Sequence, residues 1–207
     1  FIDFGGWTLF KKTLDRIKNP QFDTPIISTN LKYLGITKKF LLKYKIKKFT
    51  IILEPCKKNT AAAILSSTLL NEIKFNQPIV FLPSDHLIEK TNIFINQIKK
   101  NKKKLNEKNI FLFGVKPSYV STQYGYLLTK NSSNNLKKIN RFIEKPIYRN
   151  AKKILKKGGL WNSGMLFAKK ISIINNFKNY APSTLKFCLS SVINSRINKN
   201  VHFLNVK

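Results

Sequence analysis

Acidic residues are scarce in this sequence. Nine Asp and Glu residues stand against 39 Lys and Arg in a chain of 207, which gives a formal net charge of +30 at pH 7. A field of this sign attracts phosphorylated ligands and nucleic acid. The lysines are spread over the whole chain, and their densest run, residues 99–104, contains no aromatic side chain on which a base could stack. Nucleic acid is therefore not the expected partner, although a nucleic-acid binder stays a rival interpretation.

Long apolar runs and closely spaced cysteines are also missing. Every apolar run is far shorter than the roughly 20 residues that a membrane-spanning helix needs. The chain does not open on a basic region followed by an apolar stretch, so no signal peptide is visible. Cys56 and Cys188 have no metal-ligand spacing, and we expect free thiols. These features predict a cytoplasmic protein without a membrane span.

Helical and strand patterns alternate along the first half of the chain. Apolar residues recur at helical spacing over residues 8–17 and 34–44, and short apolar runs typical of strands lie at residues 25–29 and 49–53. Such alternation with short connections is typical of a parallel sheet wrapped by helices. A chain of 207 residues can bury one core, so we expect a single α/β domain over residues 1–207.

The stretch over residues 78–86 is the one around which we expect the chain to be organised. Its apolar run, residues 79–82, lacks polar alternation and predicts a strand buried on both faces. Asp85 and His86 follow at the expected carboxyl end of that strand, where ligands bind in open α/β sheets. The alternative is that Asp85 only caps the next turn.

A second candidate segment follows the strand at residues 49–53. Glu54 and Pro55 leave that strand, and Asn59 or Thr60 is suited to cap a helix predicted for residues 60–73. A helix N-terminus at the carboxyl edge of a sheet can bind an anion or another polar ligand. The small side chain of Ala61 would let a flat ring approach. The alternative is a capped helix that simply packs on the sheet.

A carboxylate and an ammonium group adjoin at Glu144 and Lys145, just before Pro146. A carboxylate can accept hydrogen bonds from two sugar hydroxyls, and a lysine can hold a phosphate. Adjacent side chains of a strand point to opposite faces, so both can serve one ligand only if the strand ends here. The alternative is an exposed pair of opposite charges.

Two glycine-containing segments flank that pair in the sequence. Gly125, followed by Tyr126, permits close backbone approach to a ligand or marks a β-bulge. Asn162 offers a donor and an acceptor to a sugar hydroxyl, and Gly164 removes bulk beside it. Trp161 either forms a wall of the same pocket or belongs to the core.

Several of these segments, in this order, resemble motifs of bacterial mannose-1-phosphate guanylyltransferases. The resemblance covers about residues 1–181, and it departs from the family at Lys58, Ala62, Ser84 and Gln123. The similar segments are residues 54–64 (Glu-Pro-x-x-Arg-Asn-Thr-Ala-Pro-Ala in the family), 82–86 (Leu-Pro-Ala-Asp-His), 122–126 (Thr-Gly-Tyr-Gly-Tyr), 142–146 (Phe-x-Glu-Lys-Pro) and 161–167 (Trp-Asn-Ser-Gly-Met-Phe).

The resemblance implies a fold, a reaction and a set of site residues. The fold would be a Rossmann-like nucleotidyltransferase domain with a mixed, mainly parallel central sheet flanked by helices. The reaction would join GTP and mannose 1-phosphate into GDP-mannose and pyrophosphate, with Mg²⁺ as the cofactor, for polysaccharide biosynthesis. Asp85 would bind the metal and act in catalysis together with Lys145. The residues implied in nucleotide binding are Glu54, Pro55, Asn59, Thr60, Ala61 and Ser84, and those implied in sugar binding are Gly125, Tyr126, Glu144, Asn162, Ser163 and Gly164.

Two of the family's motifs are not found in the sequence. These are its glycine-rich loop with an arginine and a Trp-x-Asp-Val-Gly segment that carries a second metal-binding aspartate. We therefore expect an incomplete domain with little turnover by itself. Three alternatives stay open: a catalytically degenerate binding protein, a transferase for another sugar phosphate, and a homo-oligomer in place of a monomer.

Overall fold

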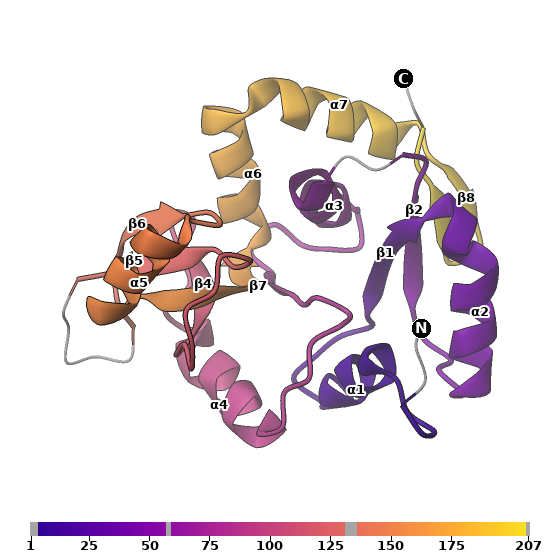
Figure 1. The fold of residues 1–207 in the computed structure, drawn as a ribbon. Helices are drawn as coiled ribbons and strands as arrows, with labels where there is room; N and C mark the ends of the chain where they lie inside the picture. Colours follow the sequence, from indigo (N-terminus) through magenta and orange to yellow (C-terminus); the bar gives the residue numbers. More distant parts are fainter. Residues whose placement is uncertain (1–3, 57–58, 131–135, 206–207) are drawn as a thin grey trace. The chain divides into compact units, whose positions relative to one another are not determined.

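The structure, a computed structural model, describes residues 4–56, 59–130 and 136–205 (Figure 1). The chain forms two compact units: unit 1 comprises Phe1–Ile110 and Phe167–Lys207, and unit 2 comprises Phe111–Leu166. Helices and strands alternate through most of the chain, which confirms the predicted α/β class. A single domain over residues 1–207 stays a prediction.

Unit 1 contains most of the helices. Its elements are α1 (Leu9–Arg16), β1 (Ile26–Asn30), η1 (Leu31–Tyr33), α2 (Leu34–Lys43), β2 (Thr50–Glu54), α3 (Asn59–Thr68), β3 (Pro78–Phe81), α4 (Thr91–Lys102), α6 (Lys170–Tyr180), α7 (Pro182–Ile193), β8 (Arg196–Asn198) and β9 (Val201–Phe203). The elements of unit 2 are β4 (Ile110–Val115), β5 (Tyr126–Thr129), β6 (Ile139–Ile143), α5 (Tyr148–Lys156) and β7 (Leu160–Lys169), of which β7 continues into unit 1.

A mainly parallel sheet of order β1-β2-β9-β8 forms the centre of unit 1. Strands β1 and β2 run parallel, with Ile26 opposite Thr50 and Asn30 opposite Glu54. Strand β9 lies parallel to β2 on its other side, and the short β8 is antiparallel to β9. The two strands predicted at residues 25–29 and 49–53 are therefore present and are direct neighbours.

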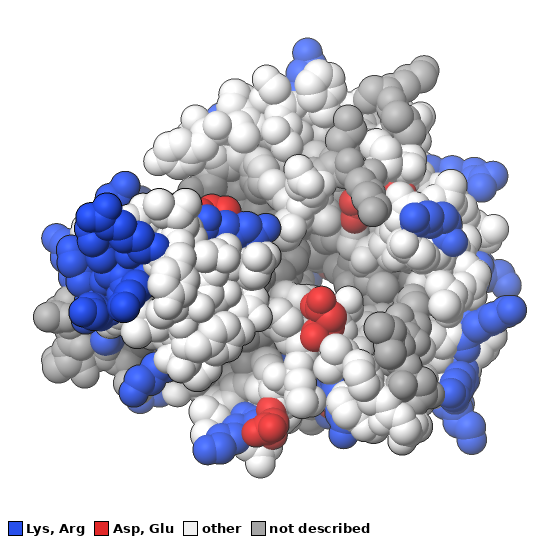
Figure 2. Space-filling model, viewed as in Figure 1, with Lys and Arg blue, Asp and Glu red and all other residues white. Residues whose placement is uncertain are grey.

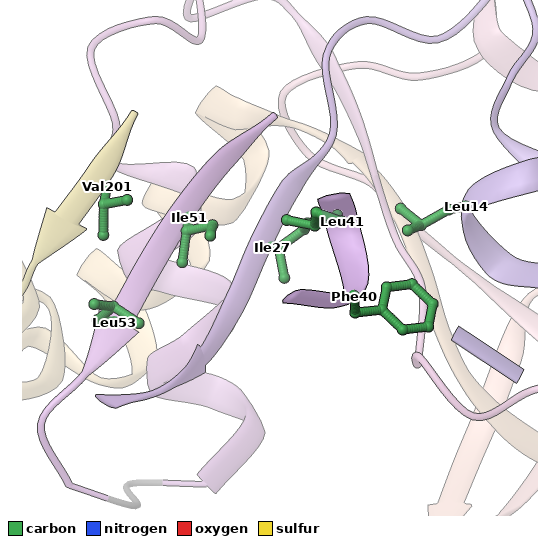
Figure 3. Packing of buried hydrophobic residues seen from close by; sticks show 7 residues of the cluster. All are labelled: Leu14, Ile27, Phe40, Leu41, Ile51, Leu53 and Val201. Atoms are coloured by element: carbon green, nitrogen blue, oxygen red, sulfur yellow. The ribbon is translucent and has the colours of Figure 1, made fainter. Parts of the chain in front are cut away.

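Strand β2 is the buried centre of that sheet. Ile51, Ile52 and Leu53 are 0%, 0% and 1% exposed. Because side chains of a strand alternate between faces, they enter two different clusters. Ile52 packs with Leu70 and Leu204. The cluster on the other face, shown in Figure 3, comprises Leu14, Ile27, Phe40, Leu41, Ile51, Leu53 and Val201.

Strand β3 differs from its prediction. The apolar run at residues 79–82 does form a strand, but every residue of β3 is only half-buried. The strand lies at the end of a sheet of order β3-β7-β5-β6, in which β4 also pairs with β7. An end strand has a neighbour on one side only, so the expectation of burial on both faces was wrong. The apolar run of β2, not that of β3, marks the buried strand.

Helix boundaries follow capping chemistry. Thr8 caps α1 as its position predicts, because its Oγ1 accepts a hydrogen bond of 3.0 Å from the backbone N–H of Lys11. Helix α5 is followed by Gly158 with φ +75°, the left-handed conformation expected after a helix. Helix α3 ends at Thr68, earlier than predicted. No helix in the described part of the chain has the length and apolar character needed to cross a membrane.

A buried lysine holds the segment that follows α3. The Nζ of Lys170 donates hydrogen bonds to the carbonyl oxygens of Leu70 and Ile73, at 2.8 and 2.9 Å, and lies 5.5 Å from the centre of the Phe75 ring. Lys170 is 6% exposed, and burial lowers the pKa of its ammonium group. These bonds give partners to carbonyl groups of the irregular segment that follows α3.

We predict that Lys170→Met lowers the free energy of unfolding by about 1–3 kcal/mol, because two buried carbonyl groups lose a charged donor. Urea unfolding followed by circular dichroism measures this change. The matched control is Lys178→Met, which changes an exposed lysine of the same helix and should shift stability by no more than about 0.5 kcal/mol. Equal stability of the two variants would contradict the structural role of Lys170.

Candidate functional site

The predicted site residues divide between the two units. Asp85 and all of the residues assigned to the nucleotide lie in unit 1, whereas Lys145 and all of those assigned to the sugar lie in unit 2. Each group is described within its own unit.

In unit 1, the carboxyl ends of β1 and β2 form a hydrogen-bonded group around Glu54. The Oγ of Ser28 donates to Oε1 of Glu54 at 2.5 Å, and Nδ2 of Asn30 donates to the Glu54 carbonyl oxygen at 3.0 Å. The parallel register, with Asn30 opposite Glu54, brings these residues together. The sequence analysis missed Ser28 and Asn30. Because both residues lie near the carboxyl end of the predicted strand that pairs with β2, their position could have indicated them.

A cavity of about 210 Å³ lies at the same end of unit 1. Its lining is rich in hydroxyl groups and contains one carboxylate; the residues are Phe4, Thr8, Leu9, Phe10, Ile27, Ser28, Thr29, Thr37, Ser84 and Asp85. Ser28 contacts both this cavity and Glu54, so Glu54, Ser84 and Asp85 belong to one neighbourhood.

One hydroxyl in the cavity lining lacks a hydrogen-bond partner. Thr37 is 1% exposed, and its Oγ1 has no partner among the described residues. A buried hydroxyl without a partner is costly unless a ligand or an ordered water satisfies it. The cavity is smaller than a typical ligand pocket of roughly 300–1,000 Å³, so it suits one polar part of a larger ligand.

Helix α3 places the remaining nucleotide-side residues at its N-terminus. Asn59, Thr60 and Ala61 form the start of this helix and are exposed, and Asn59 has a left-handed φ of +64°. The first backbone N–H groups of a helix have no helical partner, and the helix dipole favours negative charge there. The helix starts shortly after the Glu54 end of β2, so the position suits a polar or anionic group of a ligand.

In unit 2, Gly125 makes room for Glu144. A Cβ atom on Gly125 would lie 2.7 Å from Oε2 of Glu144 and 2.8 Å from a ring carbon of Phe142, distances that a real side chain does not tolerate. The backbone carbonyl of Gly125 also accepts a hydrogen bond of 2.7 Å from the N–H of Asn162. The structure therefore brings Gly125, Glu144 and Asn162 together.

The turn after β6 lets Glu144 and Lys145 act side by side. Strand β6 ends at Ile143, and Lys145 has a left-handed φ of +39° before Pro146. That conformation is uncommon for a residue other than glycine and costs about 1–3 kcal/mol, so the surrounding structure must favour it. It brings Nζ of Lys145 within 3.8 Å of Oε1 of Glu144. Adjacent side chains inside a strand would point to opposite faces. Because β6 ends before Glu144, the side chains of Glu144 and Lys145 can point to the same side.

Asn162, Ser163 and Gly164 lie within β7, where local hydrogen bonds hold the backbone. Oδ1 of Asn162 accepts from the N–H of Gly164 at 3.2 Å, and Gly164 has a φ of +73°, which favours glycine. The Oγ of Ser163 donates to the Phe113 carbonyl at 2.7 Å and accepts from the N–H of Met165 at 3.2 Å. Ser163 is therefore bound mainly to its own unit, and Asn162 lies beside Gly125.

Tyr126 has a structural role that the sequence analysis did not predict. It is 0% exposed and packs with Ala151 and Ile154. Its hydroxyl donates to the Ser121 carbonyl at 2.8 Å and accepts from the Ser121 N–H at 3.1 Å. Because this side chain lies in the core, the sugar contact expected of Tyr126 would have to come from its backbone.

Two nearby tyrosines, Tyr119 and Tyr124, were not among the site residues expected from the sequence. Both tyrosines pack on Trp161. The ring centre of Tyr119 lies 4.8 Å from that of Trp161, and the ring centre of Tyr124 lies 4.9 Å from it. Tyr119 is 55% exposed and Tyr124 is 42% exposed, so they form an aromatic surface next to Asn162. The high density of tyrosine between residues 119 and 126 is the signal that could have indicated it.

The surface of the molecule reflects the charge surplus. In Figure 2, acidic side chains form a few isolated patches, whereas basic side chains gather most densely over the part of unit 2 that contains α5. Arg149, Lys152, Lys153 and Lys156 of α5 are exposed, while its Ala151 and Ile154 are buried. The helix thus keeps a solvated basic face and packs through the opposite one.

The fold agrees with the comparisons to known proteins. The chain belongs to the nucleotidyl transferase family, which it matches over residues 1–204. It is 28% identical over 205 residues to the mannose-1-phosphate guanylyltransferase of Escherichia coli, covering 95% of this chain and 43% of that protein. It is 29% identical over 190 residues to the alginate biosynthesis protein AlgA of Pseudomonas fluorescens, covering 89% of this chain and 39% of AlgA.

Solved structures show the same fold. A crystal structure described as mannose-6-phosphate isomerase from Helicobacter pylori matches with a TM-score of 0.86 and 29% identity, covering 98% of this chain and 80% of that chain. A structure from Thermus thermophilus, described as a mannose-1-phosphate geranyltransferase, matches with a TM-score of 0.80 and 20% identity, covering 97% of this chain and 64% of that one. The present chain spans about two fifths of the length of the curated relatives it matches.

Proposed function

We propose that this chain forms the nucleotide- and sugar-binding part of a mannose-1-phosphate guanylyltransferase. The reaction converts GTP and mannose 1-phosphate into GDP-mannose and pyrophosphate, and GDP-mannose then serves polysaccharide biosynthesis. One observation carries the proposal: two groups of polar residues, around Glu54 and Asp85 in unit 1 and around Glu144 in unit 2, are each built by specific local geometry. The named mannose-1-phosphate guanylyltransferases and AlgA among the relatives support the same assignment.

Unit 1 supplies the nucleotide side in this proposal. Glu54, oriented by Ser28, accepts hydrogen bonds from the nucleoside, and the N-terminus of α3 at Asn59 and Thr60 offers backbone donors. Pro55 and Ala61 contribute small or rigid surfaces beside which a flat base fits. Ser84 lines the cavity next to Asp85 and adds a hydroxyl.

The donor set around Asp85 fits a magnesium ion. Among the described residues there is no group of three or more His, Cys, Asp or Glu side chains that could hold a metal ion. Mg²⁺ nevertheless binds through only one or two carboxylates when substrate phosphates supply further oxygens. Asp85, with the hydroxyls of Ser28, Thr29 and Ser84 in the same lining, is such an oxygen-rich position. The ion would neutralise charge on the phosphates of GTP.

Unit 2 supplies the sugar phosphate side. Glu144 accepts hydrogen bonds from sugar hydroxyls, and the adjacent Lys145 binds the phosphate. Asn162 and the backbone around Gly125 and Gly164 complete the contacts. In the reaction, a phosphate oxygen of mannose 1-phosphate forms a bond to the α-phosphorus of GTP, and the bond from that phosphorus to pyrophosphate breaks. The residues of this chain bind and orient the two reactants and offset their negative charge.

Isomerisation of mannose 6-phosphate is a second candidate activity. It is favoured by the similarity to the Helicobacter pylori structure named as an isomerase. Both names concern a mannose phosphate, so this ligand class is common to the two candidates. The free Cys56 and Cys188 suit the reducing cytoplasm in which we place either activity.

Ligand selectivity tests the proposed function. We expect the 207-residue chain to bind GDP-mannose more tightly than UDP-glucose in calorimetric titration with Mg²⁺ present. The physical reason is that both the base and the sugar differ between these ligands, so both units contribute to discrimination. An assay for isomerisation of mannose 6-phosphate by the same preparation distinguishes the isomerase candidate from the guanylyltransferase. Equal affinities for the two nucleotide sugars would contradict the guanylyltransferase assignment.

Replacement of Asp85 by asparagine tests the metal role. We predict that Asp85→Asn leaves thermal stability nearly unchanged but weakens GTP binding in Mg²⁺ by at least about tenfold, a loss that even outer-sphere metal partners show. GTP titrations with Mg²⁺ and with EDTA measure the metal-dependent part. If Asp85 only caps a turn, asparagine keeps that function and the two proteins should bind alike.

Gly125→Ala tests the sugar side. The added Cβ displaces the ends of the Glu144 and Phe142 side chains, which are exposed and can move, so stability should change by only about 1 kcal/mol or less. Binding of mannose 1-phosphate should nevertheless be lost, because Glu144 leaves its position. Gly35→Ala in α2, where a Cβ meets nothing within 4 Å, is the control and should retain binding. Unchanged sugar phosphate affinity in Gly125→Ala would remove Glu144 from the site.

A further inference from the structure

Arg16, the last residue of α1, is a buried cation that the proposed reaction does not use. It is 3% exposed, and its guanidinium lies 5.9 Å from the centre of the Phe94 ring. Its Nη2 donates a hydrogen bond of 2.8 Å to the backbone carbonyl of His86, and its Nε and Nη1 have no partner among the described residues. Burial lowers the pKa of the Arg16 guanidinium.

Such an arrangement is expensive for stability alone. Taking a guanidinium out of water costs several kcal/mol unless good hydrogen bonds compensate, and here only one of its three nitrogens has a partner in the described chain. An apolar side chain at the end of α1 would pack against Phe94 without that cost. We therefore infer that arginine at position 16 serves a function through its hydrogen bond to the His86 carbonyl.

The contact joins α1 to a loop that has no regular secondary structure. Residues 82–90, between β3 and α4, form no helix or strand within the described chain, and they carry Ser84, Asp85 and His86. The His86 carbonyl is adjacent in sequence to the exposed Asp85 carboxylate. The Arg16 guanidinium holds this one carbonyl while it also lies over the Phe94 ring, and a lysine ammonium reproduces that combination less well.

Both ends of α1 reach this loop. At its N-terminal end, Thr8, Leu9 and Phe10 line the cavity together with Ser84 and Asp85. At its C-terminal end, Arg16 binds the loop at His86. Helix α1 thus forms a wall of the cavity and also anchors the segment that carries the carboxylate.

We propose that Arg16 is a positioning residue: through the His86 carbonyl it holds the loop of residues 82–90 so that Asp85 presents its carboxylate to the Mg²⁺ of the bound nucleotide. The inference rests on the proposed metal role of Asp85. It predicts that loss of Arg16 loosens this loop and weakens metal-dependent nucleotide binding, while metal-free nucleotide binding is unchanged.

The experiment uses the 207-residue chain with Arg16→Met, Arg16→Lys and the matched control Lys170→Met. Lys170 is also a buried cation that donates to backbone carbonyls in unit 1, but its partners are Leu70 and Ile73. Hydrogen exchange measured by mass spectrometry should show faster exchange over residues 82–90 in both Arg16 variants and not in Lys170→Met. Denaturant titration of each variant separates this local change from a loss of global stability.

Calorimetric titration with GTP supplies the second measurement. We expect Arg16→Met to weaken GTP binding in Mg²⁺ by about tenfold, the effect typical of residues that orient a metal ligand, with no change in EDTA. If residues 82–90 exchange no faster than in Lys170→Met, the proposal is overturned. It is also overturned if Asp85→Asn weakens binding in Mg²⁺ and Arg16→Met does not. If the loop loosens but neither variant alters binding in Mg²⁺, Arg16 anchors the loop and the metal role of Asp85 is what fails.

Discussion

The parallel pairing of β1 with β2 is the interaction on which unit 1 depends. Ile51 and Leu53 enter one buried cluster and Ile52 enters another, so a shift of one residue would exchange the side chains that the two clusters receive. The register is therefore fixed by the core. The same register places Ser28 and Asn30 beside Glu54. The core thus determines which polar groups meet at the carboxyl edge, and the candidate nucleotide side is a consequence of how the strands pack.

Unit 2 depends on a different constraint, the absence of a side chain at Gly125. Only glycine leaves space for the Glu144 carboxylate at that point of the backbone, and the left-handed Lys145 then turns its ammonium group toward the same carboxylate. The missing side chain of Gly125 and the uncommon backbone conformation of Lys145 together gather these polar groups. Such features persist when the surrounding structure over-determines them, and they concentrate at functional sites.

Much of the local structure could be predicted from the sequence because its causes are local. The cap at Thr8, the strands that became β1 and β2, and the left-handed Gly158 each follow from a residue and its near neighbours. Helix α7 was not among the helices expected from the sequence, although Leu185, Leu189 and Val192 recur at helical spacing and Pro182 stands at its first turn. The motif segments located most of the candidate site residues.

Other features could not be predicted, because they depend on contacts between distant residues. The half-burial of β3 follows from its place at the end of a sheet, and sequence alone does not give strand order. Tyr126 turns inward because Ser121 satisfies its hydroxyl and α5 covers its ring. The contact from Arg16 to His86 joins residues far apart in the chain, and no pattern near either residue indicates it.

The central claim is that the residues around Glu54 and Asp85 in unit 1 bind a nucleotide and that those around Glu144 in unit 2 bind a sugar. The most direct measurement is hydrogen exchange of the 207-residue chain with and without saturating GDP-mannose and Mg²⁺. We predict slower exchange in both units during the same titration: in residues 54–61 and 82–90 of unit 1, and in residues 125–127 and 143–146 of unit 2. Protection confined to one unit, or spread equally over α5 and the rest of the basic surface, would contradict this account.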